Sequence, residues 1–533
     1  MTDLICPGCE QPAGALREGV CLSCWYQAPE RPKPIRDRFA KLEKLRALGV
    51  EPYAYSYDPT EELATARTRF EAAEKTEETD ELAPVRLAGR ILSYRDMGKS
   101  AFAHLGDRDG RLQLYLKHDV LGEKGVELLE LLDLGDWIGV AGSLFRTRTG
   151  EVTVRVEEIT LLAKTLRPLP FGKEEVTETG ERVVHSGFSD VEARYRQRYA
   201  DLAVNPDVRE IFRIRTRLTT GFRAWLDERD FLEVETPILQ PLYGGALARP
   251  FTTRHESLDR TLYLRIADEL YLKRLIVGNL DRVYEIGKDF RNEGIDRTHN
   301  PEFTMLELYY AYADYESVMS LVEEMVTDVV QGVMGTLSFE FEGREVDLSR
   351  PWKRQTFAEA FEGSTGLDPE TAPHEELSAA AGRVGREDAS DLSRVQLLDV
   401  LFSAHVEAGI IDPTIIRDHP IEMSPLAKPR RGNAAYAERF EVVTCGFEII
   451  NAFSELNDPL DQWTRFMEQD RLRAEGDAEA HGVDKDYVRA LEYGLPPTGG
   501  LGLGIDRLAM LITGQTTIRE VILYPILREE EGE

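Results

Sequence analysis

The chain has 533 residues, 42% of them hydrophobic, enough to bury two or three separate cores. Acidic residues number 96 against 65 lysines and arginines, and the net charge of -31 argues against indiscriminate binding to DNA or other nucleic acid. The sequence contains no run of about 18 uncharged apolar residues, and its N-terminus lacks the basic-then-apolar pattern of a secretory signal. We expect a globular, cytoplasmic protein without a membrane partner, in which any RNA contact needs locally basic surface.

Four of the five cysteines lie within the first 24 residues. They form two CxxC pairs, Cys6 with Cys9 and Cys21 with Cys24. Two tight turns of this kind present four thiolates tetrahedrally to zinc, and so short a segment has almost no apolar core without a metal. We therefore predict a zinc ribbon-like segment over residues 1–28 that binds Zn²⁺ through these thiolates. The alternative is two incidental or redox-active thiol pairs.

A basic amphipathic helix is predicted after the proline-spaced linker Pro29 to Pro34. Its apolar residues recur at helical spacing: Ile35, Phe39, Leu42 and Leu45. Its other faces carry five cations: Arg36, Arg38, Lys41, Lys44 and Arg46. Such helices commonly contact RNA phosphates, and the alternative is an ordinary solvated face. We assign this helix to an N-terminal extension over residues 29–75.

Short alternating strands with glycine and aspartate turns run from about Val85 to Leu162. Five strands in about 80 residues predict a small Greek-key barrel, for which the oligonucleotide-binding (OB) fold is the commonest candidate. We expect this domain over residues 76–170. The sequence MGKS at Met97 to Ser100 imitates the end of a P-loop, but Ser93 replaces the earlier glycine and no helix pattern follows.

A polar linker over residues 171–200 leads to a third region, residues 201–533. This region begins with a long amphipathic helix (Ile211, Ile214, Leu218, Phe222 and Trp225) that runs into the predicted strand FLEVETPIL. Residues 364–393 are acidic and alanine-rich with helical spacing, which predicts an inserted helical lobe. The lobe shows no residues that indicate chemistry.

The segment FRNEGIDRTHNPEFTMLELY, residues 290–309, mixes both signs of charge with aromatic residues. We predict that VYEIGKDFRNE and PEFTMLELYYAY are the arms of an antiparallel hairpin. Period two then places Arg291 and Glu293 on one face of the first arm, and Phe303, Met305, Glu307 and Tyr309 on one face of the second. Arginine clamps phosphate, glutamate accepts from an exocyclic amine and phenylalanine stacks a purine. The pattern indicates a nucleotide site; the alternative is a salt-bridged solvent face.

The C-terminal stretch PPTGGLGLGIDRLAMLITG carries four glycines and then Arg507 at the start of an apolar helix. It matches neither GxGxxG nor a P-loop, and alone it is compatible with a packing strand. Together with FRNE it resembles motifs 2 and 3 of the class II aminoacyl-tRNA synthetases, and FLEVETPIL, with Pro237, is similar to motif 1. A barrel before the catalytic region is similar to the group that charges aspartate, asparagine and lysine.

Within that group, EARYRQRYADL, GGALARPF, RIADELYLKRL and NAFSELNDP resemble the bacterial lysyl-tRNA synthetases over roughly residues 35–533. The cysteine-rich start is not part of the usual pattern, and the linker around Glu174 to Val184 is longer than usual. The fold class implied is α+β and multidomain. It comprises a zinc ribbon-like segment, a five-stranded OB-fold barrel and an antiparallel-sheet catalytic domain flanked by helices.

The resemblance implies that the lysine carboxylate attacks the α-phosphorus of ATP, pyrophosphate leaves, and the terminal hydroxyl of tRNA(Lys) takes the lysyl group. It implies catalytic roles for Arg291 and Arg507. The implied ATP-binding residues are Arg291, Glu293, His299, Phe303, Glu441 and Arg507. The implied lysine-binding residues are Gly245, Glu269, Arg291, Tyr309, Asn451, Phe453, Glu455 and Gly502.

Within these sets the resemblance implies that Glu269 binds the α-amine, while Glu455 and Tyr309 hold the distal ammonium. It also implies anticodon contacts by Phe102, Gln113 and Glu151 in the barrel. A homodimer is implied as well, with the motif 1 helix packed against its twofold mate through the apolar stripe that includes Ile211, Leu218 and Trp225.

Glu441 and Glu448 lie seven residues apart in ERFEVVTCGFEIINAF. Straight alternation places them on opposite faces, and spacing alone indicates surface carboxylates; a bulge near Cys445–Gly446 would bring them together. The resembled family uses these positions for Mg²⁺, which prefers hard oxygen ligands. Cys445 itself is expected to be a small packing residue.

Two other functions compete with tRNA charging. Paralogues that lysylate a protein resemble the catalytic domain without the barrel and tend to carry a larger residue at the position of Gly502. A non-enzymatic RNA-binding regulator built on an inactive synthetase would be expected to have lost some of the residues named above, and all of them are present.

Overall fold

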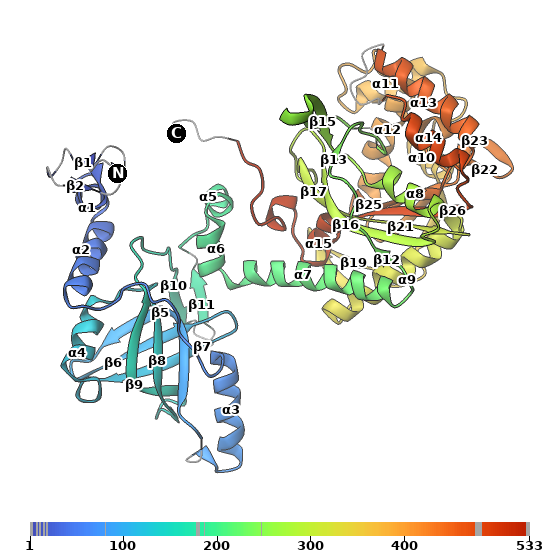
Figure 1. Cartoon of the computed structure of the whole chain (residues 1–533). Helices are drawn as coiled ribbons and strands as arrows, with labels where there is room; N and C mark the ends of the chain where they lie inside the picture. Colours follow the sequence, from blue (N-terminus) through green and yellow to red (C-terminus); the bar gives the residue numbers. More distant parts are fainter. Residues whose placement is uncertain are drawn as a thin grey trace. The chain divides into compact units, whose positions relative to one another are not determined.

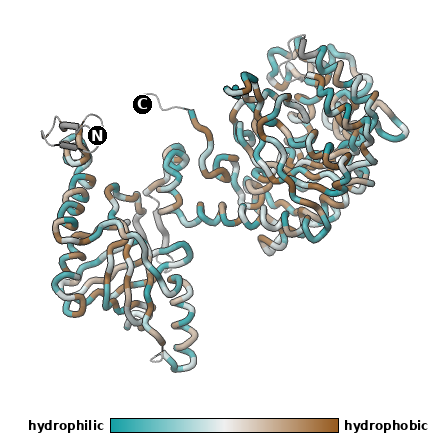
Figure 2. Tube along the Cα trace, viewed as in Figure 1, coloured by the Kyte–Doolittle hydropathy of each residue, from teal (hydrophilic) through white to brown (hydrophobic). Residues whose placement is uncertain are grey.

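The computed structural model describes residues 4–6, 9, 12–13, 16–17, 20–79, 82–176, 182–185, 187–246, 248–474 and 482–528. The chain forms two compact units, Met1–Ser189 and Asp190–Glu533. Hydrophobic residues gather on the barrel strands of the first unit and in the interior of the second (Figure 2). Among the described residues, no helix has the length and apolar character needed to cross a membrane. The finer division predicted at residues 28, 75, 170 and 200 stays a prediction.

The first unit begins with two short antiparallel strand pairs and three helices (Figure 1). These are β1 (Leu4–Ile5) with β2 (Pro12–Ala13), β3 (Leu16–Arg17) with β4 (Val20–Cys21), α1 (Leu22–Gln27), α2 (Lys33–Ala47) and α3 (Leu63–Lys75). The ring of Tyr26 in α1 stacks on Phe39 of α2 at 4.9 Å between centroids. This stacking joins the cysteine-rich segment to the helix that follows it.

The predicted amphipathic helix is present as α2, and its apolar stripe is buried. Its cations, however, do not form a uniform RNA-facing surface. Arg38 is buried and donates to the Leu134 carbonyl at 2.8 Å, and Lys41 pairs with Asp133 at 2.8 Å. Two of the five cations therefore anchor the helix to the loop at Asp133 and Leu134 of the barrel domain, where Lys41 compensates the charge of Asp133.

The predicted five-stranded barrel is confirmed and is closed in the order β5-β6-β7-β9-β8. Its strands, with one helix inserted between β7 and β8, are β5 (Val85–Asp96), β6 (Ser100–Gly106), β7 (Arg111–Lys117), α4 (His118–Leu131), β8 (Trp137–Arg146) and β9 (Val152–Ala163). Buried and partly exposed residues alternate along β6 and β7, which leaves the second set on the outer surface. The MGKS sequence lies at the β5–β6 turn and not at a P-loop.

The predicted linker over residues 171–200 contains secondary structure that sequence patterning did not indicate. A small hairpin, β10 (Lys173–Val176) with β11 (Arg182–His185), ends the first unit, and α5 (Val191–Arg196) and α6 (Arg198–Val204) begin the second. The middle of the longer linker, residues 177–181, lies outside the described residues.

An eight-stranded sheet forms the centre of the second unit, in the order β12-β16-β17-β26-β25-β24-β21-β20. In that order the strands are Leu232–Glu233, Arg282–Phe290, Glu302–Ala311, Thr498–Gly504, Phe447–Ser454, Arg439–Thr444, Thr414–Arg417 and Lys353–Thr356. The two edge strands pair in parallel and all other neighbours are antiparallel. The predicted antiparallel catalytic sheet is therefore confirmed.

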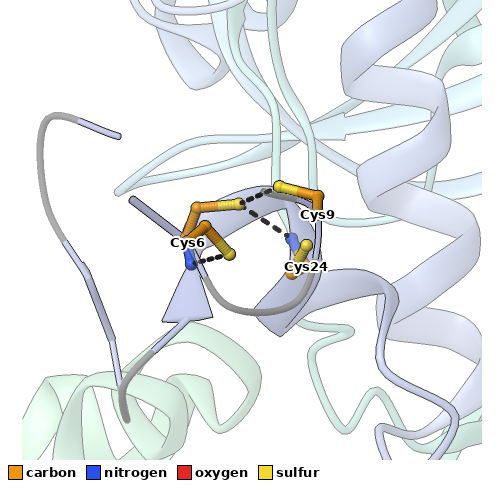
Figure 3. Close-up of side chains that lie close together, drawn as sticks. Cys6, Cys9 and Cys24 are labelled. Carbon is orange, nitrogen blue, oxygen red and sulfur yellow. Dashed lines mark hydrogen bonds between the residues drawn. The ribbon is translucent and has the colours of Figure 1, made fainter. Parts of the chain in front are cut away.

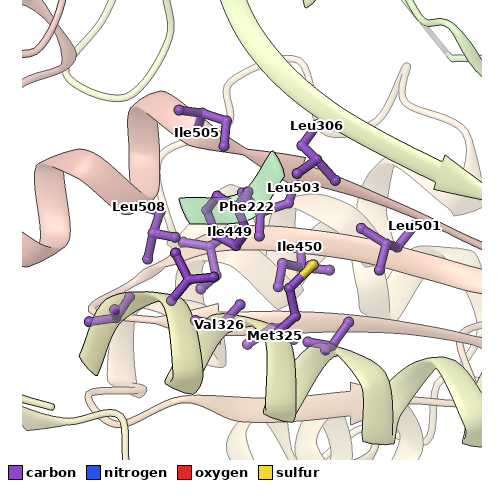
Figure 4. Packing of buried hydrophobic residues seen from close by; sticks show 14 of the residues in the cluster. Phe222, Leu306, Met325, Val326, Ile449, Ile450, Leu501, Leu503, Ile505 and Leu508 are labelled. Atoms are coloured by element: carbon purple, nitrogen blue, oxygen red, sulfur yellow. The ribbon is translucent and has the colours of Figure 1, made fainter. Parts of the chain in front are cut away.

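Three helices bury one face of this sheet: α7 (Pro206–Asp227), α9 (Tyr315–Met334) and α15 (Ile505–Ile512). Figure 4 shows Phe222 of α7 and Met325 of α9 packed near Ile450 and Leu503 from the strands. The stripe predicted to contact a second copy lies in this core, since Leu218 is fully buried and Trp225 is 7% exposed. Those two residues hold α7 to its own sheet, which corrects the predicted role of the stripe.

Motif 1 is not the single strand that its sequence suggests. It forms β12 and, after Pro237, β13 (Leu239–Gln240), which joins a second, three-stranded sheet with β15 (Arg260–Leu264) and β14 (Thr252–His255). Proline has no N–H to continue a ladder, so the chain leaves one sheet and enters the other. Three of its apolar residues are exposed, Leu232, Ile238 and Leu239, and so is Leu242 just after it.

The inserted helical lobe is larger than the predicted 364–393. It comprises α10 (Phe357–Thr365), α11 (His374–Arg383) and α12 (Arg394–His405), which share a core of their own that also includes Ile416 and Val443 of the sheet. The remaining elements are α8 (Glu269–Val277), β18 (Ser338–Phe341), β19 (Arg344–Asp347), β22 (Pro429–Arg430), β23 (Asn433–Ala437), α13 (Pro459–Ala474) and α14 (Lys485–Glu492).

Candidate active site

The face of the sheet away from the core is hollow because its central strand carries glycines there. Across β17, β26 and β25, Glu307 lies beside Gly502 and Gly502 beside Asn451. In the next row Tyr309 lies beside Gly500, which lies beside Phe453. A Cβ on Gly500 would lie 2.2 Å from Glu455 Oε1 and 2.3 Å from Tyr309 Cε1. Only glycine therefore permits these two side chains to lie where they do.

A cavity of about 360 Å³ lies above this floor. The predicted site residues that line it are Gly245, Glu269, Arg291, Glu293, His299, Phe303, Tyr309, Glu448, Asn451, Phe453, Gly502 and Arg507. Two others, Glu441 and Glu455, are buried and do not line the cavity. Residues from distant parts of the sequence thus meet in a single cavity.

The predicted hairpin is confirmed as β16 and β17, but its first strand is shorter than the sequence indicates. It ends at Phe290, and Arg291 continues the pairing with a single bond from its N–H to the Pro301 carbonyl at 2.9 Å. The next residue, Asn292, instead donates to the Arg249 carbonyl at 2.8 Å. The chain therefore leaves the hairpin and turns toward the loop that contains Arg249. Glu293, in the connection between β16 and β17, lines the cavity from there.

One end of the cavity carries cations and a stackable ring. The guanidinium of Arg291 lies over the ring of Phe303, 5.0 Å from its centroid. Arg507 donates to the Glu448 carbonyl at 2.7 Å and to His299 Nε2 at 2.9 Å. Guanidinium groups beside an aromatic face suit a ligand that combines phosphates with a planar base.

The other end is acidic, and it contains a cation that sequence analysis did not identify. The buried ammonium of Lys273 contacts the carboxylates of both Glu269 and Glu455. Although burial alone would lower its pKa, Glu269 and Glu455 raise the pKa of Lys273 above the ordinary value. The available signal was the four-residue spacing of Glu269 and Lys273, which places both on one face of α8.

Glu307 was predicted to lie on this face but was not among the predicted ligand-binding residues. Its carboxylate lines the cavity and accepts from the Tyr309 hydroxyl at 3.2 Å. Burial, followed by the nearby charges of Asp289 and Glu269, raises the pKa of Glu307 to about 8. Lys273 therefore pairs with two carboxylates, those of Glu269 and Glu455, and Glu307 adds a third carboxyl group at this end of the cavity. The surplus of carboxyl groups over ammonium groups suits this end to further cationic groups.

A buried arginine supports the acidic end from behind. Arg265 pairs with Glu285 at 2.5 Å and Asp268 at 2.7 Å, and Glu285 in turn accepts from the backbone N–H of Thr236 at 3.0 Å. A Cβ at Gly287 would lie 2.0 Å from the guanidinium. The arginine thus ties motif 1 to β16 and holds the carboxylates of this layer in place.

Glu441 and Glu448 do share a face, but not for the reason that the sequence suggested. Cys445 and Gly446 both have positive φ (51° and 83°) and form a two-residue hairpin turn between β24 and β25. Val443 then lies directly opposite Glu448, so Glu448 falls on the face of Val443 and Glu441. The bulge lies elsewhere, opposite Val442 and Val443. Burial first, and then the charge of Glu441, raises the pKa of Glu448.

The four N-terminal cysteines meet as predicted. Their sulfur atoms all lie within 4.8 Å of one another, and the Sγ atoms of Cys9 and Cys21 are 3.7 Å apart. Figure 3 shows the side chains of Cys6, Cys9 and Cys24 grouped together. Zinc–sulfur bonds of about 2.3 Å in a tetrahedron place the sulfurs about 3.8 Å apart. The cluster therefore has the chemistry and the dimensions of a structural zinc site.

Comparison with known proteins agrees with this geometry. A family described as tRNA synthetases class II (D, K and N) matches residues 190–528, and an OB-fold nucleic acid binding domain matches residues 85–162. The lysine–tRNA ligase of Carboxydothermus hydrogenoformans is 47% identical over 93% of this chain and 98% of its own length. That of Moorella thermoacetica is 48% identical over 93% of this chain and 97% of its own length. The chain belongs to the class II lysyl-tRNA synthetases.

The OB-fold barrel of this lysyl-tRNA synthetase brings together the three predicted anticodon residues. The ring of Phe102 on β6 lies 5.1 Å from that of Tyr115 on β7. Gln113, two residues before Tyr115, donates to the Glu151 carboxylate at 2.8 Å. The barrel therefore presents an aromatic platform and an ordered amide on the same outer surface.

The raised pKa of Glu307 predicts a specific pH dependence of stability. Between the ordinary value of 4.5 and about 8, the folded protein keeps a proton that the unfolded chain has released. This contribution to stability is full below pH 4.5 and is lost as the pH rises through 8. Glu307→Gln keeps the shape and removes the titration. The free energy of unfolding is measured in urea at about pH 5 and at about pH 8. Its decrease between these two pH values should be larger for the wild type than for the variant. Equal slopes would contradict the assignment.

Proposed function

We propose that the protein activates L-lysine with ATP and transfers the lysyl group to the 3′ end of tRNA(Lys) in the cytoplasm. The observation that carries this proposal is the division of one cavity into a cationic, aromatic end and an acidic end. ATP needs the first and the two ammonium groups of lysine need the second. Membership of the lysyl-tRNA synthetases supports the same reading.

In the first step, a lysine carboxylate oxygen forms a bond to the α-phosphorus of ATP while the bond to pyrophosphate breaks. Arg291, which lies over the Phe303 ring at the cationic end, contacts the lysine carboxylate and the α-phosphate in this proposal. Phe303 and Arg507 hold the adenine between them, Glu293 accepts from its amine, and His299 faces the phosphate tail. The protein contributes position and charge, without a covalent nucleophile.

The acidic end recognises lysine by charge and length. Glu269 and Glu307 bind the α-ammonium, Glu455 and Tyr309 bind the distal ammonium, and Asn451 and Phe453 border the stem. Gly245 and Gly502 leave room for the backbone of the substrate. An acidic amino acid would place a carboxylate among these glutamates and is thereby excluded.

Glu441 and Glu448 fit Mg²⁺, since their carboxylates share one face, and burial followed by the charge of Glu441 raises the pKa of Glu448. Arg439 pairs with Glu441 at 2.6 Å and orients it. Bound there, Mg²⁺ would neutralise charge on the phosphates of ATP.

Three features disfavour the competing functions. A barrel with an exposed aromatic and amide surface serves an RNA substrate, which a protein-lysylating enzyme does not need. A Cβ at Gly502 would lie 2.9 Å from the Met305 methyl, so a larger residue there would close the cavity that this chain keeps open. An inactive regulator has no reason to keep the complete set of cavity residues.

Lysine specificity is tested at Glu455. Glu455→Gln should depress lysine-dependent ATP–pyrophosphate exchange by roughly 10³-fold or more, because the distal ammonium of bound lysine would lose its charged partner. The KM for ATP should change little. Glu492→Gln, on an exposed position of α14, is the matched control and should behave as wild type. Full activity of the Glu455 variant, or a preference of the wild type for aspartate or asparagine, would refute the assignment.

Zinc in the N-terminal cluster is tested by metal analysis. The purified protein should carry about one zinc per chain. Deletion of residues 1–28 should abolish that zinc and leave lysyl-adenylate formation intact, because the cavity lies wholly in the second unit. Stoichiometric zinc in the truncated protein would exclude the cysteine site.

A homodimer is proposed from the exposed apolar residues around motif 1, with Leu232 and Leu239 each about half exposed (50% and 51%). A C₂ interface buries the same patch of both subunits. Sedimentation equilibrium at micromolar concentration should give twice the 60.3 kDa chain mass. Leu239→Asp should shift the protein toward the monomer, whereas the same change at the exposed Leu460 of α13 should not. A monomeric wild type would rule the dimer out.

A further inference from the structure

Four polar side chains form a continuous row across neighbouring strands of the barrel, three of them partly exposed and Thr153 buried. Ser93 on β5 lies opposite His104 on β6, His104 opposite Gln113 on β7, and Gln113 beside Thr153 on β9. The adjacent row is Arg95, Phe102, Tyr115 and Arg155. An aromatic row thus runs beside a polar row, and the side chain of Glu151, just before β9, joins the polar one.

The polar row is joined by hydrogen bonds whose directions follow from chemistry. The Glu151 carboxylate only accepts, so His104 Nε2 donates to its Oε1 at 2.9 Å and Gln113 Nε2 donates to its Oε2 at 2.8 Å. His104 Nδ1 is then free to accept from the Ser93 hydroxyl at 2.8 Å. Thr153 completes the chain by donating to Gln113 Oε1 at 2.9 Å.

These bonds fix the orientation of the Gln113 amide. Its NH₂ group must face the carboxylate and its oxygen must face the threonine, which leaves one N–H and one oxygen lone pair for a ligand. Uracil presents an acceptor (O4) beside a donor (N3–H), whereas cytosine presents a donor (N4–H₂) beside an acceptor (N3). If the Gln113 amide is fixed in one orientation, its N–H and oxygen match the donor and acceptor order of either uracil or cytosine, but not of both. If the amide can rotate by about 180°, it can match both bases.

His104 is placed to keep this orientation without reading the base itself. Its side chain is 15% exposed, against 29% for Glu151, and both of its ring nitrogens are engaged within the row. It is the second anchor of the Glu151 carboxylate. Without it, the carboxylate that orients the Gln113 amide loses one of its two side-chain hydrogen bonds among the described residues and is held less firmly.

We propose that His104 is a positioning residue that locks the Gln113 amide, through Glu151, in the orientation that accepts a uridine of the anticodon and rejects cytidine. The inference rests on the proposed function, in which Phe102 and Gln113 bind the anticodon. It adds a residue that touches no nucleotide to the determinants of tRNA choice.

The test compares His104→Phe, which keeps a ring of similar size and removes both hydrogen bonds, with His104→Gln, whose amide N–H is able to donate to Glu151. Charging is measured with a tRNA(Lys) transcript and with three transcripts that each carry cytidine at one anticodon position. Lysine-dependent ATP–pyrophosphate exchange is measured in parallel and reports on the second unit alone. His118→Phe, at the start of α4 and outside both rows, is the matched control.

His104→Phe should raise the KM for tRNA(Lys) about five- to tenfold. It should also lower the ratio of kcat/KM for uridine to kcat/KM for cytidine by at least about threefold at one anticodon position. For comparison, a bidentate base contact gives roughly 10- to 100-fold discrimination. Pyrophosphate exchange should be unchanged, and His104→Gln should recover most of the ratio. His118→Phe should leave both measurements at the wild-type level.

The inference is overturned if His104→Phe keeps the wild-type ratio while Gln113→Ala lowers it, or if His104→Gln fails to recover what His104→Phe loses. A parallel loss of pyrophosphate exchange in His104→Phe would also overturn it, in favour of general damage to the protein. If Phe102→Ala and Gln113→Ala both leave charging of every transcript unchanged, the anticodon assignment itself fails. That result differs from a failure of the His104 lock alone.

Discussion

The glycines of β26 are the constraint on which the cavity depends. A central strand in an eight-stranded sheet normally fills both faces with side chains, and here Leu501 and Leu503 do so only on the core side. On the other side Gly500 and Gly502 leave a trough between β17 and β25. The strand therefore anchors the hydrophobic core and creates an open floor at the same time, which two-residue periodicity makes possible.

Charge then divides the trough into two ends. Lys273 supplies one buried positive charge to Glu269 and Glu455, and it ties α8 to the strand end at Glu455. A fully compensated pocket would have no affinity for a diamine, and an uncompensated one would cost too much free energy to bury. The resident ammonium stabilises the empty pocket, and in the proposed function the negative charge that remains binds the substrate.

The barrel handles polar recognition differently from the catalytic cavity. In the cavity, charged groups are buried behind glycine and lie close to one another, so their pKa values shift. On the barrel, polar side chains from neighbouring strands form one hydrogen-bonded row that includes a single carboxylate, Glu151. Each unit builds its site by cross-strand pairing, since directly opposed residues on neighbouring strands share a face.

The sequence by itself determined the local features of this protein. The alternation between Val85 and Leu162 specified the barrel strands, the two CxxC pairs specified the thiolate cluster, and the hairpin around residues 290–309 followed from period two. Motif order was enough to indicate the family and twelve of the residues that line the cavity, because each motif is a short local pattern.

Tertiary structure alone decided which of these residues meet and on which face. Tyr309 pairs with Gly500, far along the chain, and no local pattern states that partnership. The sequence of the apolar stripe of α7 is equally compatible with a subunit interface and with the core of its own domain. Packing against α9 places the stripe in the core. Glu441 and Glu448 share a face because a two-residue turn puts them on opposing strands, whereas alternation assumes one strand. Lys273 was hidden for the same reason: its partner Glu455 comes from another element, and burial between two carboxylates depends on long-range pairing that periodicity does not encode.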